Sequence, residues 1–133
     1  MEHKRAWLYC RTAYPDAHAL TVQQAQLEAF AEKRGFEIVG TTAEHASGLN
    51  FSRRGLAEVS CAVEAGGVDL LLVTNLSRLG RDVQKTDAYL RWLEDHSIDV
   101  VCTDGTIPQV CTEILHKLLK ASGAHLEIAQ YPF

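Results

Sequence analysis

Two arginines follow an apolar run in the middle of the sequence. The run, Leu70 to Val73, is typical of a buried parallel strand, and Arg78 and Arg81 come shortly after it. If this segment is helical, the three-residue spacing places both guanidiniums on one helix face. Ligands of open α/β sheets bind beyond the carboxyl ends of the strands, so the pair suits a bound anion. The alternative is a solvated pair of arginines that forms ion pairs with Asp82 or Asp87.

The elements that would position these arginines alternate between strand and helix. We expect strands at 6–11, 36–42, 68–74 and 98–103, and helices at about 20–34, 55–65 and 82–95. Thr21 is the expected N-cap of the first helix, and Gly35 is its expected end. This alternation predicts a single α/β domain with a mostly parallel sheet of about four to five strands flanked by helices.

The C-terminal region forms a separate part of this prediction. We expect residues 1–106 to form the α/β domain and residues 107–133 to form a short helix, 108–120, and a tail. The helix carries an apolar stripe that would pack on its own sheet or form a dimer contact. We expect no DNA-binding domain in this region.

Composition limits the partners of the chain. Its 133 residues suffice for one domain, and 47% hydrophobic and 23% charged residues are ordinary for a globular protein. The net charge of −4 argues against a generally basic surface for nucleic acid. Any DNA contact would therefore need a local arginine cluster. No segment has the apolar length of a signal peptide or a membrane span, so no membrane contact is expected.

The cysteines and histidines give no sign of a metal site. Cys10, Cys61, Cys102 and Cys111 are far apart and form no CxxC pair, which favours a reduced, cytoplasmic setting. The six histidines show no metal-ligand spacing with one another or with the cysteines. We therefore expect neither a metal nor a cofactor.

Four arginines are expected at one edge of the sheet. The carboxyl ends of the strands would bring Arg11 and the polar loop from Ser47 to Arg53 beside Arg78 and Arg81. Several guanidiniums can surround the tetrahedral oxygens of a phosphate and stabilise charge that develops there. A single arginine is more often a surface residue than a ligand, but four at one edge favour a phosphate site.

This sequence lacks the residues that other phosphate-handling α/β proteins need at specific positions. A response regulator needs acidic residues after the first strand and an aspartate after the third, where this chain has Tyr9-Cys10-Arg11 and Thr74-Asn75. A cysteine phosphatase needs an arginine six positions after a cysteine, and none of the four cysteines has one. No GxGxxG or Walker sequence is present.

Several segments, taken in order, resemble the motifs of the serine recombinase (resolvase/invertase) catalytic domain. They are Tyr9-Cys10-Arg11, Gln23, Ala46-Ser47-Gly48 with Arg53-Arg54-Gly55-Leu56, and Leu76-Ser77-Arg78-Leu79-Gly80-Arg81. The resemblance covers residues 7–104 and implies a flavodoxin-like fold. It also implies duplex DNA as the substrate, cleaved without a metal through a phosphoserine link to the 5′ end.

The resemblance also implies roles for individual residues. Those implied to bind the phosphate and stabilise its charge are Arg11, Arg53, Arg78 and Arg81. Gln23 and Ser47 would supply supporting hydrogen bonds. The family's nucleophile lies two residues after the first-strand arginine, and this position holds Ala13. A methyl group has no lone pair with which to attack phosphorus.

Ala13 leaves several explanations open. We expect a catalytically inactive domain that binds DNA, weakly when alone, or that associates as a homodimer or with another recombinase subunit. The residues after Ala13 depart from the polar loop usual in the family, which favours a natural loss of the serine. The alternatives are an engineered or truncated form of an active recombinase, and a dimerisation module with vestigial arginines. A neighbouring hydroxyl, from Thr12 or Tyr14, could also replace the serine, although Thr12 should face away from the arginines.

Overall fold

The centre of the sheet is made by two strands that are buried on both faces. In the computed structural model, which describes residues 3–48 and 53–108, these are β1 (Arg5–Thr12) and β3 (Leu70–Val73). The edges are β2 (Glu37–His45) and β4 (Asp99–Cys102), and the strand order is β2-β1-β3-β4. Every neighbouring pair is parallel. The predicted fold class, a parallel α/β sheet flanked by helices, is therefore confirmed.

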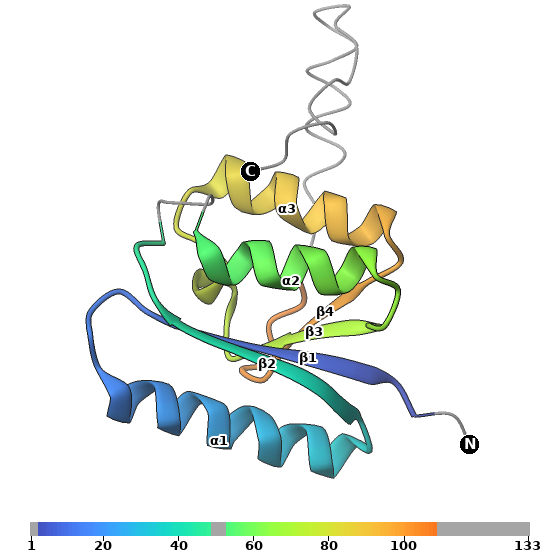
Figure 1. Cartoon of the computed structure of the whole chain (residues 1–133), viewed down its shortest axis with the longest axis horizontal. Helices are drawn as coiled ribbons and strands as arrows, with labels where there is room; N and C mark the ends of the chain where they lie inside the picture. The colour runs from blue at the N-terminus through green and yellow to red at the C-terminus, as the bar shows by residue number, and fades with distance from the viewer. Residues whose placement is uncertain (1–2, 49–52, 109–133) are drawn as a thin grey trace, which may run out of the picture.

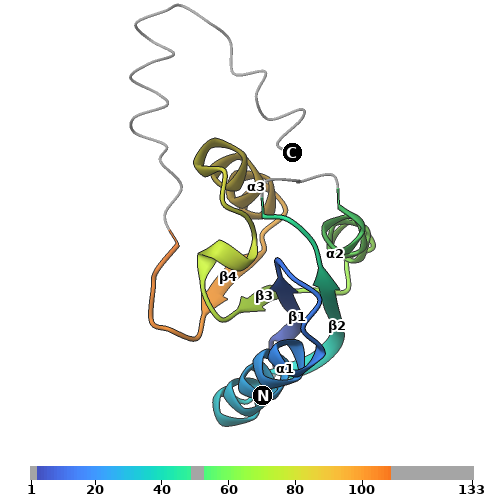
Figure 2. The same ribbon diagram turned by 90° about the vertical axis from the view of Figure 1, so that its left-hand side faces the viewer.

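Helices cover both faces of the sheet. Helix α1 (Ala17–Arg34) lies on one face, and α2 (Arg54–Glu64) and α3 (Val83–Asp95) lie on the other (Figures 1 and 2). Alternate residues of β1 enter the two cores, since Leu8 packs in the α1 layer and Tyr9 in the α2–α3 layer. A one-turn 3-10 helix, η1 (Leu76–Arg78), follows β3.

The first helix begins earlier than the sequence predicted. Its N-cap is Asp16, whose carboxylate accepts a hydrogen bond from the Ala19 backbone N–H at 3.0 Å. The prediction of Thr21 as N-cap is wrong: Thr21 lies inside the helix and its hydroxyl donates to the Ala17 carbonyl. The predicted end at Gly35 is confirmed by a left-handed conformation with φ of 74°.

The segment with Arg78 and Arg81 is not one continuous helix. Arg78 ends η1, and α3 begins only at Val83, because Asp82 caps it by accepting a hydrogen bond from the Lys85 backbone N–H at 3.0 Å. The condition for a shared helix face is therefore not met, while the predicted start of the following helix near residue 82 agrees with the cap at Asp82. The two side chains are positioned separately, one by η1 and the other by the connection to α3.

Other expectations concern single residues and the C-terminus. Cys10 and Cys102 are buried and Cys61 is exposed, and burial raises the pKa of both buried thiols to about 11. Within the described residues, no helix is long and apolar enough to cross a membrane. The predicted helix at 108–120 and Cys111 lie almost wholly outside the described residues.

Candidate active site

Arg11 lies at the end of β1 and is 2% exposed. Its Nε donates to the carbonyl oxygen of Arg78 at 2.8 Å, its Nη1 to that of Ala46 at 2.9 Å, and its Nη2 to that of Ser77 at 2.5 Å. Ala46 follows β2, and Ser77 and Arg78 belong to η1, which follows β3. The Arg11 side chain therefore joins the loops that follow its two neighbouring strands.

All four arginines lie close together at this edge, because Arg11 and Arg53 donate to the same Arg78 carbonyl and Arg11 and Arg81 approach each other at Gly48. Burial lowers the pKa of Arg11, and the positive charges of Arg53, Arg78 and Arg81 lower it further. The predicted convergence of these side chains at the carboxyl edge is thus found in the structure. Their mutual repulsion needs compensation, and part of it comes from carbonyl oxygens and one carboxylate.

Arg53 is held by a buried network. Its Nε lies 2.8 Å from the Tyr9 hydroxyl oxygen and 3.2 Å from Oε2 of Glu44, to which it donates. The Tyr9 hydroxyl donates to the same carboxylate oxygen at 2.5 Å, and the Gly55 backbone N–H donates to Oε1 at 2.9 Å. The side chains of Arg53 and Glu44 are only 2% and 14% exposed. Nη2 of Arg53 donates to the carbonyls of Arg78 and Leu79.

Gln23 and Arg78 both bind the backbone of Arg11. Gln23, buried on α1, donates through Nε2 to the Arg11 carbonyl at 3.0 Å and accepts from the Arg11 backbone N–H at 3.2 Å. Nη1 of Arg78 donates to the same carbonyl at 2.9 Å. Gln23 therefore fixes the backbone at the end of β1, from which the Arg11 side chain extends.

Arg81 differs from the other three arginines because it is exposed. Its backbone N–H donates to the Gly48 carbonyl at 2.8 Å, which ties the loop after β2 to the loop before α3. A Cβ at position 48 would lie 2.9 Å from both Cγ of Arg81 and Nη2 of Arg11, so this close approach needs glycine. Within residues 3–48 and 53–108, the Arg81 guanidinium makes no hydrogen bond or ion pair. Its side chain is therefore open to solvent.

The other predicted site residues lie on the same edge. Ser47 is exposed in the loop after β2, between Ala46 and Gly48, whose carbonyls bind Arg11 and Arg81. Ala13 is exposed and directly follows β1. The structure thus places position 13 next to the strand that carries Arg11.

The two hydroxyls beside Ala13 are directed elsewhere. The Thr12 hydroxyl donates to the Tyr14 carbonyl at 2.8 Å and lies 2.7 Å from Nδ1 of His45. The Tyr14 side chain is 78% exposed. In this arrangement, neither hydroxyl takes the place of a nucleophile at position 13.

Sequence reasoning did not assign a role to Glu44 or Tyr9, although both hold Arg53. No local motif marks this pair, because the two residues are 35 positions apart. Strand register would have been a signal. Tyr9 pairs with Thr42 across parallel strands, so Glu44 lies on the same face, two residues farther along. Burial is the largest cause that raises the pKa of Tyr9, so its hydroxyl stays protonated and donates.

The described residues offer no obvious place for a metal ion. Residues 3–48 and 53–108 contain no group of three or more histidine, cysteine, aspartate or glutamate side chains that could hold one. What this edge of the sheet offers is a set of guanidiniums, two of them buried.

The parallel sheet and its helices define the fold of serine recombinase catalytic domains. The N-terminal catalytic domain of TP901-1 integrase is 23% identical, with a TM-score of 0.70 over 90% of this chain and 94% of that chain. A resolvase family site-specific recombinase from Streptococcus pneumoniae is 21% identical, with a TM-score of 0.69 over 90% and 85%. The C-terminal catalytic domain of ISC1926 TnpA, an IS607-like serine recombinase, is 24% identical, with a TM-score of 0.65 over 88% and 79%.

The family itself follows from the sequence match. Residues 6–129 match the model of the family described as Resolvase, N terminal domain. The match spans most of the chain, so this protein belongs to the resolvase N-terminal domain family.

Proposed function

We propose that this chain is a serine-recombinase domain that binds DNA phosphates at its arginine edge and does not cleave them. What supports the proposal is the contact of Arg11 and Arg53 with the same Arg78 carbonyl and the close approach of Arg11 and Arg81 at Gly48, with Ala13 two residues after Arg11 in the sequence. An arginine cluster of this kind can bind a phosphodiester although the net charge of the chain is −4. Without a hydroxyl at position 13, the covalent step has no attacking atom.

The four arginines have two different roles in this proposal. Arg11 and Arg53 are buried and donate to carbonyls, so they act as positioning residues for the loops at this edge. Arg81 is exposed and Arg78 is half-buried, so these two make the phosphate contacts. Gln23 supports the backbone of Arg11, and Ser47 supplies a further hydroxyl at the rim.

The same proposal covers subunits and domains. Residues 1–106 form the catalytic-type domain, and residues 107–133 provide a contact to a second copy or to another recombinase subunit. DNA binding by this chain alone is weak, because the phosphate contacts are few. A cytoplasmic location, expected from the separated cysteines, stays a prediction.

Three experiments test this function. The full chain is titrated with labelled duplex DNA at several salt concentrations, and we expect weak binding that falls as salt rises. The same DNA is examined for a covalent adduct on denaturing gels, and we expect none with this chain. An adduct would contradict the inactive assignment. An Ala13→Ser variant fused to a DNA-binding module tests whether the rest of the site still supports cleavage.

A second candidate function is a protein-interaction module with vestigial arginines. The observation in its favour is that Arg11 and Arg53 donate hydrogen bonds to backbone carbonyls of the same chain. This alternative predicts no DNA binding even at low salt, together with a dimer detected by light scattering.

A further inference from the structure

Tyr14 is a large aromatic residue that the fold leaves in solvent. It lies in the short loop between β1 and α1, two residues after the end of β1, and it is 78% exposed. A single exposed apolar side chain is common on protein surfaces and by itself indicates no site. Two further observations set Tyr14 apart: the way its backbone is held, and its place beside the arginine edge.

The loop around Tyr14 is fixed at both ends. At its start, the Thr12 hydroxyl donates to the Tyr14 carbonyl at 2.8 Å and lies 2.7 Å from Nδ1 of His45. At its end, the carboxylate of Asp16 caps α1. Between them, Pro15 restricts the backbone to a φ of about −65°. The backbone of the loop is therefore ordered before any ligand binds, which lowers the entropic cost of binding.

This loop leaves the sheet beside the loop that follows β2. The Ala46 backbone N–H donates to the Thr12 carbonyl at 2.9 Å, and the Ala46 carbonyl accepts from Nη1 of Arg11 at 2.9 Å. Two residues farther along, the Gly48 carbonyl accepts from the Arg81 backbone N–H at 2.8 Å. The loop with the exposed tyrosine and the arginine edge are therefore joined through residues 46–48.

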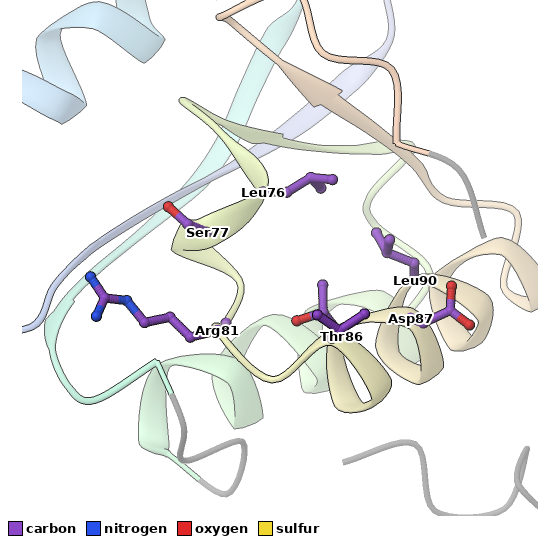
Figure 3. Close-up of a pocket in the computed structure, with 8 residues that line it drawn as sticks. Leu76, Ser77, Arg81, Thr86, Asp87 and Leu90 are labelled. Carbon is purple, nitrogen blue, oxygen red and sulfur yellow. The ribbon is translucent and has the colours of Figure 1, made fainter. Parts of the chain in front are cut away.

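The Arg81 guanidinium belongs to the same edge. Figure 3 shows that it extends away from Leu76 and Leu90, which line the pocket between η1 and α3, and that it lies on the side of Ser77. The Ser77 carbonyl in turn accepts from Nη2 of Arg11. The carboxyl edge of the sheet thus carries an exposed cation and, on a neighbouring loop, an exposed aromatic ring.

We propose that Tyr14 stacks on an unpaired DNA base while Arg81 binds a phosphate of the same strand. The inference rests on the proposed function, because it starts from a DNA phosphate at the arginine edge. Cationic side chains that follow the backbone and aromatic rings that stack on bases are the two components of sites for single-stranded nucleic acid. A tyrosine suits this role, since its ring face is apolar while its hydroxyl can stay in water.

The proposal names a preferred substrate. A base can stack on Tyr14 only where it is free of its own stack and its pairing partner, so the site favours single-stranded DNA or an unpaired segment. Stacking uses the face of the base, which every base has, so we expect little sequence preference. A strand without bases keeps its phosphates and loses only the contact with the ring.

The test compares two oligomers of equal length and charge. The full chain is titrated at low salt with a labelled oligothymidylate and with its abasic counterpart, and binding is followed by fluorescence anisotropy. We expect the oligothymidylate to bind about tenfold more tightly, which corresponds to ~1.4 kcal/mol and to one stacked base.

Three variants locate the effect. Tyr14→Ala should abolish the preference for the oligothymidylate, while Tyr14→Phe keeps the ring and should keep the preference to within about twofold. Ile107→Ala shortens an equally exposed apolar side chain after β4 and should leave the preference unchanged. All three changes concern exposed side chains, so circular dichroism should show folded proteins.

The outcomes separate the stacking contact from the phosphate site. Equal, salt-dependent binding of both oligomers by the parent would overturn the stacking proposal and leave the DNA-binding proposal standing. A preference that survives Tyr14→Ala, or that is lost in Tyr14→Phe, would also overturn the stacking proposal. No binding of either oligomer at low salt would overturn both proposals.

Discussion

Arg11 and Arg78 bind each other's backbone in both directions. Nε of Arg11 donates to the Arg78 carbonyl at 2.8 Å, and Nη1 of Arg78 donates to the Arg11 carbonyl at 2.9 Å. The two residues are 67 positions apart, at the ends of β1 and η1. Charged donors make stronger hydrogen bonds than neutral ones, so this exchange fixes the turn after β3 against the central strand.

Loss of the Arg11 guanidinium should destabilise the fold. In an Arg11→Gln variant, three carbonyls lose a charged donor, and we expect the free energy of unfolding to fall by about 2–4 kcal/mol. Urea denaturation followed by circular dichroism measures this change. The control is Arg81→Gln, which alters an exposed side chain and should stay within ~0.5 kcal/mol of the parent. Equal losses in the two variants would show that Arg11 has no special role in folding.

Arg81 should instead dominate the salt dependence of DNA binding. If its guanidinium contacts one phosphate, Arg81→Gln lowers the slope of log K against log salt by about 1. The measurement is a DNA titration at several salt concentrations. Arg34→Gln, at the opposite end of the sheet, makes the same charge change and should leave the slope as it is. An unchanged slope in Arg81→Gln would place the phosphate elsewhere.

Removing only one partner of the Glu44–Arg53 ion pair should strongly destabilise the fold. Arg53→Leu leaves a nearly buried carboxylate without its cation, and we expect a loss of about 3–5 kcal/mol in the free energy of unfolding. Adding Glu44→Gln to this variant should recover part of the loss, because the uncompensated charge is removed. Denaturation of the single and double variants checks both values. Arg54→Leu, at the exposed neighbouring position, serves as the control.

Gly55 should not tolerate a side chain. A Cβ at this position would lie 2.1 Å from Oε2 of Glu44, and Tyr9 and Arg53 hold that carboxylate in place. Gly55→Ala should therefore lower the free energy of unfolding by about 1–3 kcal/mol through overpacking. Gly67 has nothing within 4 Å of its would-be Cβ, so Gly67→Ala should change stability by less than ~1 kcal/mol. Thermal melts of the two variants distinguish them.

Asp69 should contribute a pH-dependent part of the stability. Its carboxylate accepts from Nε of Arg5 at 3.1 Å, from Nη2 at 3.0 Å and from the Arg5 backbone N–H at 2.8 Å, and these bonds lower the pKa of Asp69 to about 2. A carboxyl whose pKa is lower in the folded state stabilises the protein above pH ~4, and this contribution disappears as the pH falls to about 2.

Denaturation of Asp69→Asn across this range tests the assignment. The variant should be less stable than the parent at neutral pH, and the difference should shrink between about pH 4 and pH 2. Asp99→Asn removes an exposed pair with Lys4 and should show a smaller effect at every pH. A difference in the free energy of unfolding between Asp69→Asn and the parent that stays constant with pH would contradict the role given to Arg5.

Local signals in the sequence predict the strands and the starts of α2 and α3 to within a few residues, but they misplace the start of α1. The run from Leu70 to Val73 is apolar because both faces of the sheet are covered there, and no competing signal interrupts it. The signal at Thr21 predicts too late a start for α1, because the structure uses Asp16 as the N-cap instead. The separation of Arg78 from Arg81 depends on the cap at Asp82, which a spacing argument does not take into account.

For the site, the sequence predicted which residues meet but not what they bind. The order of strands in a parallel sheet brings Arg11, Arg53, Arg78 and Arg81 to one edge, and this follows from the alternation of elements. The partners of Arg11 and Arg53 are backbone carbonyls of distant loops, and carbonyls carry no sequence signature. The division between positioning and exposed arginines therefore needed the folded structure.

The bonds of Arg11 to three carbonyls bear on how this family changes over evolutionary time. A residue that only stabilises a transition state is free to vary once the reaction is lost. Arg11 also holds two loops to the central strand, so a chain that no longer cleaved DNA would still need it to fold. A chain with alanine at position 13 thus has a reason to keep its first-strand arginine that owes nothing to recombination.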